Sequence, residues 1–163
     1  MIMKVDFRIE GIDNVMRSMN AEAEKLKLTS AKGLIEAAIE IRHATEKDSP
    51  ITPVDEGNLR ASFHITTKRG KEPGGGNFKG KNASKMKGQH HQVIGMEAAT
   101  VAMKKYPTIA IGYTANYAAE VHEYPASTKW KRPGSGHKWL ERNLKRSREK
   151  LLGIIRGEIK LER

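Results

Sequence analysis

The spacing of apolar side chains changes several times along the chain, and each change marks an element that we expect. Residues 3–9 alternate between apolar and polar, which predicts a half-buried strand. Two helical patterns follow: one is capped at its start by Asp13 and reaches Leu26, and the other runs from about Thr29 to the Ser49-Pro50 break. We expect one long, bent helix or two collinear helices.

The segment 52–63, TPVDEGNLRASF, is where the helical period gives way to a period of two. Pro53 ends the upstream helix, and the Asp55 carboxylate is placed to cap a new turn by accepting from the backbone N–H of Gly57 or Asn58. From the residues alone, this is a helix-to-strand corner. The residues that we expect to fix the exit of the strand are Val54, Asp55, Gly57, Leu59 and Arg60.

Residues 69–88 are rich in glycine and lysine and nearly empty of apolar groups. Such a segment gains too little from burial to offset the entropy of ordering its backbone, so we predict a long flexible basic loop or arm. Its three consecutive glycines lack the spacing of a phosphate-binding loop. The candidates for contact with a partner protein or DNA are Lys79, Lys81, Lys85 and Lys87.

The second half of the chain predicts further strands and two helices. His91–Met96 and Thr100–Met103 are short strand candidates, and 108–113 is the strongest strand pattern in the chain. Ala115–Tyr124 has the spacing of a short helix, which Pro125 ends.

A basic loop over 126–136 leads into a last helix, predicted from about His137 to Leu161. One face of this helix carries an apolar stripe made of Leu140, Leu144, Leu151, Ile155 and Ile159. Its other face is cationic, with Arg142, Lys145, Arg146 and Lys150. The elements together predict an α+β fold in a single domain over 1–163: N-terminal helices packed on a small, mostly antiparallel sheet, with a C-terminal helix.

Composition suggests that this core is thin for its length. Of 163 residues, 37% are hydrophobic and only 6% aromatic, so we expect part of the chain to be unstructured or part of its apolar surface to be completed by another copy or a partner. The chain has no cysteine and no apolar run of the roughly 20 residues that a membrane helix needs. We expect a soluble protein in a cytoplasm-like setting.

The formal net charge is +11, which favours polyanionic partners. No zinc-finger or RNA-recognition signature is present in the sequence, so we do not expect base-specific reading. The cationic face of the last helix is open to two interpretations, a solvated face or a polyanion contact.

Residue types that often serve in catalysis are present, but their spacing does not support a catalytic site. No HExxH motif is present in the sequence, no serine lies in a G-x-S-x-G elbow, and Asp55 and Glu56 are adjacent on a turn and diverge. We therefore expect no enzyme, metal or cofactor. The residues weighed for a metal are Glu120, His122, Glu123 and His137, with His90 and His91 in reserve.

Three segments, in order, resemble the tail-completion or neck (minor head-tail joining) proteins of tailed double-stranded-DNA bacteriophages. The corner is similar to that family's P-V-D-x-G-x-L-R-x-S motif, IGYTANYAAEVHEY to its strand and Y-A-x-x-V-E helix, and GHKWLERNLKRS to the start of its closing helix. The family's E-F-G-T is here Glu123-Tyr124-Pro125-Ala126, and the 69–88 segment is longer and more basic than the family's usual loop.

The resemblance implies a non-enzymatic structural protein of the virion, assembled in the host cytoplasm. Such a subunit would form a homo-oligomeric ring of six or twelve copies. The ring would lie between the portal or adaptor of the head and the tail tube or tail terminator, and it would not contact a membrane. It would let genomic DNA pass, with non-specific contact. Tyr117, Glu120 and Glu123 are the residues expected to face a neighbouring subunit. The alternative is a small monomeric basic nucleic-acid-binding protein.

Overall fold

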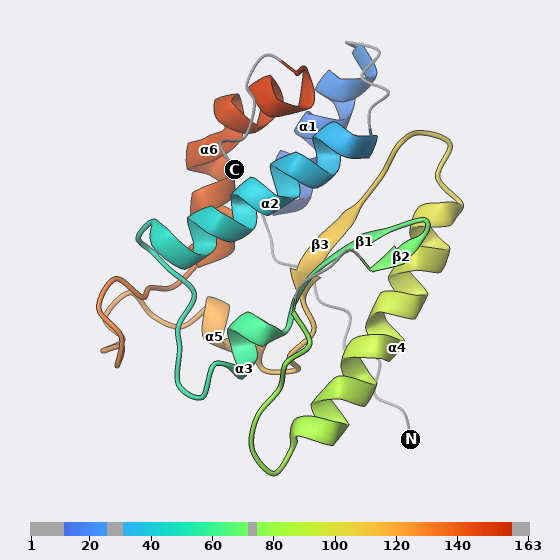
Figure 1. The fold of residues 1–163 in the computed structure, drawn as a ribbon. Coiled ribbons are helices and arrows are strands. Elements are labelled where there is room, and N and C mark those ends of the chain that lie inside the picture. Colours follow the sequence, from blue (N-terminus) through green and yellow to red (C-terminus); the bar gives the residue numbers. More distant parts are fainter. Residues whose placement is uncertain (1–11, 26–30, 72–74, 158–163) are drawn as a thin grey trace.

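The computed structural model describes residues 12–25, 31–71 and 75–157 (Figure 1). The predicted strand over 3–9, the link at 28–30 and Ile159 lie outside these ranges. In chain order the elements are α1 (Ile12–Lys25), α2 (Ala31–Lys47), α3 (Asn58–Ala61), β1 (Phe63–Thr67), β2 (Gly70–Lys71), α4 (Ala83–Ala102), β3 (Ala110–Tyr113), α5 (Ala118–His122) and α6 (Trp139–Ile155). This arrangement confirms an α+β fold.

A layer of three helices holds most of the core. α6 packs most extensively against α2, and α1 also packs against α6. The predicted apolar stripe of α6 is buried: Leu144 and Leu151 are fully enclosed, and Leu140 and Ile155 nearly so. α2 comes close to the end of α6 at Gly33, where a Cβ would lie 3.0 Å from the carbonyl oxygen of Ile155. A larger residue at Gly33 would push the two helices apart.

The sheet has the order β2-β1-β3, and both of its pairings are antiparallel. β1 lies in the middle, with Phe63 opposite Tyr113 and Ile65 opposite Ile111 on β3. Figure 1 shows α4 on one side of this sheet and the layer of α1, α2 and α6 on the other. All five residues of β1 are buried because both faces of the strand are covered.

The two faces of β1 differ in chemistry, as the alternating pattern predicted. Phe63 and Ile65 pack with Ala38 of α2. His64 faces α4, where its Nε2 lies 2.5 Å from Oε2 of Glu97, and it is only 2% exposed. The sheet is therefore apolar toward α2 and polar toward α4.

The expectation of collinear N-terminal helices is wrong. α1 and α2 run in roughly opposite directions, so the chain reverses between them (Figure 1). The reason is packing: Met19 of α1 joins the same buried cluster as Leu144 and Leu152 of α6. Both α1 and α2 pack on α6, and the 17 residues of α6 are too few to contact two such helices placed end to end.

The segment between β2 and β3 contains a long helix where the sequence predicted an arm and strands. The helix α4 begins at Ala83, within the segment predicted as a flexible arm, and it includes all of the strand predicted over His91–Met96. The buried residues of α4 are His90, Ile94 and Val101, four and seven residues apart. One of these anchors is a histidine, so the apolar signal of the helix is too sparse to be recognised.

The strand predicted over Thr100–Met103 is also wrong, because this segment is the last turn of α4, with Met103 as its C-cap residue. The loop between β2 and α4 is attached to the body of the protein. The backbone of Lys79 makes two hydrogen bonds with the side chain of Asn58, at 2.8 Å to Oδ1 and 3.0 Å from Nδ2. Lys85 and Lys87 lie on α4, so they do not belong to an arm.

The remaining predicted elements are present with different bounds. α1 begins at Ile12, so Asp13 lies inside the helix and does not precede it as a cap. β3 matches the end of the 108–113 pattern, α5 lies inside 115–124, and α6 begins two residues after His137. Residues 126–136 contain no helix or strand, as predicted. Trp139, the first residue of α6, is 1% exposed and belongs to the buried core.

Candidate interaction surfaces

The corner at 52–63 is tied by hydrogen bonds to α2 and β3. Thr52 is bound to the end of α2, where its N–H and its hydroxyl both donate to the carbonyl oxygen of Thr45, at 2.7 and 3.0 Å. The hydroxyl of Tyr113 on β3 lies 2.8 Å from Thr52 Oγ1 and donates to Thr45 Oγ1 at 3.3 Å. This cluster of three hydroxyls joins α2, the corner and β3.

Four of the five predicted corner residues have a structural reason to be in this corner. Gly57 adopts φ 88°, a left-handed conformation that favours glycine, and immediately precedes α3. Leu59 is buried at 5% exposure, and Val54 is half-buried. Arg60 donates to Glu46 Oε2 at 2.8 Å.

Glu46 ties the corner to α2 through two arginines. Arg60 and Arg42 donate to its two carboxylate oxygens at 2.8 and 3.2 Å. Burial alone would raise the pKa of Glu46, but the hydrogen bonds and charges of Arg60 and then Arg42 outweigh it and leave the pKa below its ordinary value. The carboxylate therefore stays ionised as the pH falls into the range where free glutamates take up protons.

The predicted capping role of Asp55 is wrong. α3 has no side-chain cap, and Asp55 Oδ1 instead accepts from Lys131 Nζ at 2.6 Å, across 76 residues of sequence. Both side chains are largely exposed, so salt will screen this pair. Its position links the corner to the basic loop over 126–136.

An acidic patch, which we define as Asp55 and Glu56, lies close enough to Tyr117 for its charges to act on the phenol. Tyr117 is half-buried, and burial, then the charge of Glu56 and then that of Asp55 raise its pKa. Glu120 is exposed three residues further along α5, and therefore on the same side as Tyr117. The structure thus brings two predicted interface residues together with the corner.

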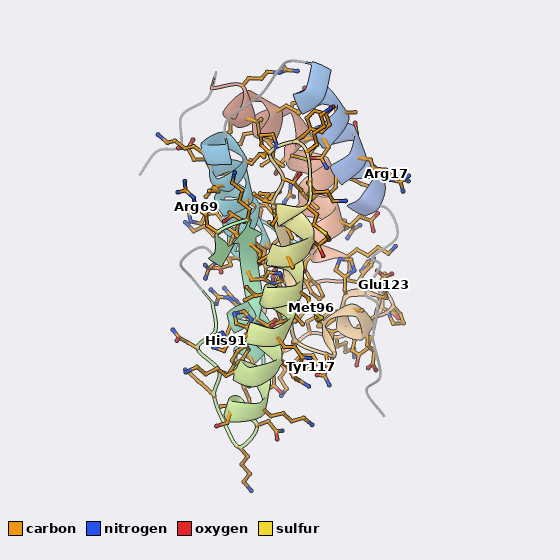
Figure 2. All side chains as sticks on the ribbon, turned by 90° about the vertical axis from the view of Figure 1, so that its right-hand side faces the viewer. Arg17, Arg69, His91, Met96, Tyr117 and Glu123 are labelled. Carbon is orange, nitrogen blue, oxygen red and sulfur yellow. The ribbon has the colours of Figure 1, made fainter. Side chains whose placement is uncertain are left out.

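Glu123, the third predicted interface residue, is engaged within the chain. Its Oε1 lies 2.7 Å from His122 Nδ1, and its Oε2 lies 3.5 Å from Lys138 Nζ. Figure 2 shows Tyr117 and Glu123 beside α5, to one side of α4. Tyr117 and Glu120 are consequently better placed than Glu123 to meet a neighbour.

The residues weighed for a metal site do not converge. His122 is 1% exposed, and its ring packs against Trp139 with the centroids 4.7 Å apart. Burial lowers the pKa of His122, although the hydrogen bond to Glu123 opposes the change. Among the residues that the structure describes, no group of three or more histidine, aspartate or glutamate side chains could hold a metal ion.

The outer side of α4 carries an uncharged surface that we call the α4 face. From Gly88 onward, its exposed residues recur with helical spacing and include no lysine, arginine or acid: Gly88, His91, Gln92, Gly95, Met96, Ala99, Thr100, Ala102 and Met103. The exposed Lys85 lies on the same side of the helix, just before this surface begins. Met96 is 54% exposed and Met103 80%, and Tyr106 just beyond the helix is 54% exposed. Figure 2 turns this side of α4 toward the viewer, with His91 and Met96 labelled.

The candidate lysines gather before and within the first turns of α4. Lys79, Lys81, Lys85 and Lys87 are all exposed. No acidic residue lies in the first turn of α4, and the carboxylate of Glu56 lies beside Gly80 in the preceding loop, so Lys85 and Lys87 on the helix are further from an acid than Lys79 and Lys81 are. An anionic surface would be favoured at this end of the helix.

The described part of the chain contains no helix with the length and apolar character to cross a membrane. Comparisons of the chain with family models, with curated proteins and with solved structures found no match.

Proposed function

We propose that this chain is a structural subunit of a phage neck, which assembles with copies of itself into a ring joining the head to the tail. The observation that carries the proposal is the α4 face, a helix surface with Met96 and Met103 exposed and no charged side chain among its exposed residues. Large exposed apolar side chains that cluster on one element are typical of protein contacts.

Charge favours a contact between unlike surfaces of neighbouring copies. Lys85 and Lys87 on α4 and Glu120 on α5 are exposed, opposite in sign and belong to different elements. A contact in which one subunit presents lysines and the next presents acids is head-to-tail, and such contacts generate closed rings when the rotation closes. The order of the three motifs that resemble neck proteins supports the same assignment.

A substitution on the α4 face tests the proposal. We expect Met96→Glu with Met103→Glu to lower the assembled mass toward the 18.2 kDa of one chain, because carboxylates would have to be buried at the contact. Both residues are exposed, so the thermal midpoint of the subunit should change little. Size-exclusion chromatography with light scattering measures the mass, and circular dichroism measures the midpoint.

The matched control adds the same charge elsewhere. Asn14→Glu with Ser127→Glu changes two exposed positions away from α4 and should leave the mass unchanged. If the methionine variant assembles as the unmodified chain does, the α4 face is not the contact and the proposal loses its main support.

A second function is favoured by the net charge of +11, namely that of a small monomeric nucleic-acid-binding protein. It predicts a strict monomer whose binding to duplex DNA weakens steeply with salt. The mass measurement separates the two functions directly, since only the neck subunit requires self-assembly.

A further inference from the structure

An open groove of about 1,040 Å³ lies between the first half of α6 and the basic loop over 126–136. Its lining contains no carboxylate among the described residues. One wall of the groove is formed by residues of α6, Arg142, Lys145 and Arg146, and by His137 just before the helix. The facing walls include Trp130 and Pro50. An anion would therefore meet cations on one wall without a competing acid in the lining.

Neither arginine of this groove is paired with a carboxylate among the described residues. Arg146 donates to two neutral oxygens, the carbonyl of Ser49 at 2.8 Å and Oδ1 of Asn143. The guanidinium of Arg142 is exposed and has no hydrogen-bond or ion-pair partner within the described ranges. Lys145, unlike the two arginines, forms an ion pair with a carboxylate, that of Glu141 on the preceding turn.

One of these guanidinium groups is also held in place by the core. Asn143, which orients Arg146, is fully buried, and its Nδ2 donates to the carbonyl oxygens of Pro50 at 2.9 Å and Trp139 at 2.8 Å. A guanidinium positioned in this way loses little freedom when it binds an anion, and its fork of donors matches phosphate oxygens.

We propose that this groove binds the phosphodiester backbone of duplex DNA without reading its sequence. Arg142 and Arg146 are i and i+4 neighbours, about 5–6 Å apart at Cβ, while one DNA strand carries roughly one phosphate per 3.4 Å of axis. Two further cations of the loop, the exposed Lys129 and the half-buried Arg132, lie within two residues of Trp130 in the sequence, and Lys131 between them is paired with Asp55. An extended cationic surface fits a continuous polyanion better than a short acidic segment.

Each subunit would carry this groove whether or not it assembles, so DNA binding at the groove is separate from ring assembly. The experiment measures fluorescence anisotropy of a labelled duplex of mixed sequence with the full chain over a series of salt concentrations. For Arg142→Gln with Arg146→Gln we expect the slope of log affinity against log salt to become shallower by about 1.8, since each neutralised phosphate contributes about 0.9. The affinity at moderate salt should fall about tenfold or more.

The matched control is Lys85→Gln with Lys87→Gln, which removes the same charge from exposed positions on α4. The lysine variant should change the slope of log affinity against log salt, and lower the affinity for the duplex, clearly less than the arginine variant does. Equal or larger losses in the lysine variant would overturn the assignment to the groove. Unchanged binding in the arginine variant would do the same.

Two further measurements keep the test decisive. The single variant Arg142→Gln leaves the contacts of Arg146 intact and should still make the slope shallower by about 0.9, so a folding defect at Arg146 cannot mimic the result. Polyglutamate of equal charge should compete weakly. If it displaces the duplex at equal concentration of charge and shows the same dependence on Arg142, the groove is a site for acidic protein segments and the DNA assignment is wrong.

Discussion

Tyr113 shows how single hydroxyl groups hold the corner in place. Its O–H lies between the side chains of Thr52 and Thr45, at 2.8 and 3.3 Å, and so connects β3 to two segments that are distant in sequence. Burial raises the pKa of Tyr113, so the phenol stays protonated and able to donate. The hydrogen bonds of Tyr113 can form only when α2, the corner and β3 are all in place.

We therefore expect Tyr113→Phe to lower the free energy of unfolding by about 1–2 kcal/mol, because hydrogen bonds are lost inside the protein while Thr52 keeps its bond to Thr45. Urea unfolding followed by circular dichroism measures the change. Tyr124→Phe is the control, because no hydrogen bond of its hydroxyl is found within the described ranges. Equal effects of the two substitutions would contradict the role of Tyr113.

His122 gives stability a dependence on pH. Burial lowers its pKa below the ordinary 6.5, with Glu123 opposing the change. As the pH falls below 6.5, the unfolded chain takes up a proton at this site that the folded chain does not, so the free energy of unfolding decreases. Glu46 and Glu141 have lowered pKa values, so their contributions are lost at more acidic pH, below about 4.5.

His122→Gln should make the free energy of unfolding fall less steeply between about pH 7 and pH 5.5. The substitution removes the group that titrates, whatever it does to stability at neutral pH through the lost contact with Trp139. Urea unfolding at several pH values measures this slope. Identical slopes for the variant and the unmodified chain would show that His122 is not responsible.

At the scale of whole elements, periodicity predicts some parts well and others poorly. α2, β1 and α6 carry clear apolar periods, and their core residues Ile41, Phe63 and Leu144 are buried as those periods require. Periodicity misses α4 because this helix packs on the polar face of β1 and buries a histidine in place of an aliphatic residue. The pairing of Asp55 with Lys131 could not be predicted, since it depends on the fold bringing distant segments together.

The packing of α4 on the rest of the protein should be less stable than the packing of α6. Of its 20 residues only His90, Ile94 and Val101 are buried, whereas ten of the 17 residues of α6 are. His64 Nδ1 and Thr66 Oγ1 are buried with no hydrogen-bond partner among the described residues, which reduces the gain from this contact.

Amide hydrogen exchange should therefore be faster along α4 than along α6, with α4 opening while α2 and α6 stay protected. Exchange is measured by mass spectrometry on the Met96→Glu, Met103→Glu variant, which we expect to be monomeric, so that a neighbouring subunit does not protect α4. Protection of α4 equal to that of α6 would show that the two helices unfold together.

At the scale of the whole molecule, three surfaces differ in chemistry. The α4 face is uncharged, the acidic patch lies at the corner, and the groove beside α6 is cationic. A chain whose surfaces are divided in this way can meet copies of itself through one pair of surfaces and a polyanion through another. The low apolar content of 37% predicted either unstructured segments or a surface completed by a partner, and the α4 face that we propose for such a contact could be located only from the fold.

The central claim is that the chain assembles with itself, and its mass in solution is the most direct test. Light scattering on the unmodified chain at moderate salt should give a single species of six or twelve copies of the 18.2 kDa subunit. A strict monomer at every concentration, with duplex binding that weakens steeply as salt rises, would contradict the ring and support the monomeric nucleic-acid-binding protein.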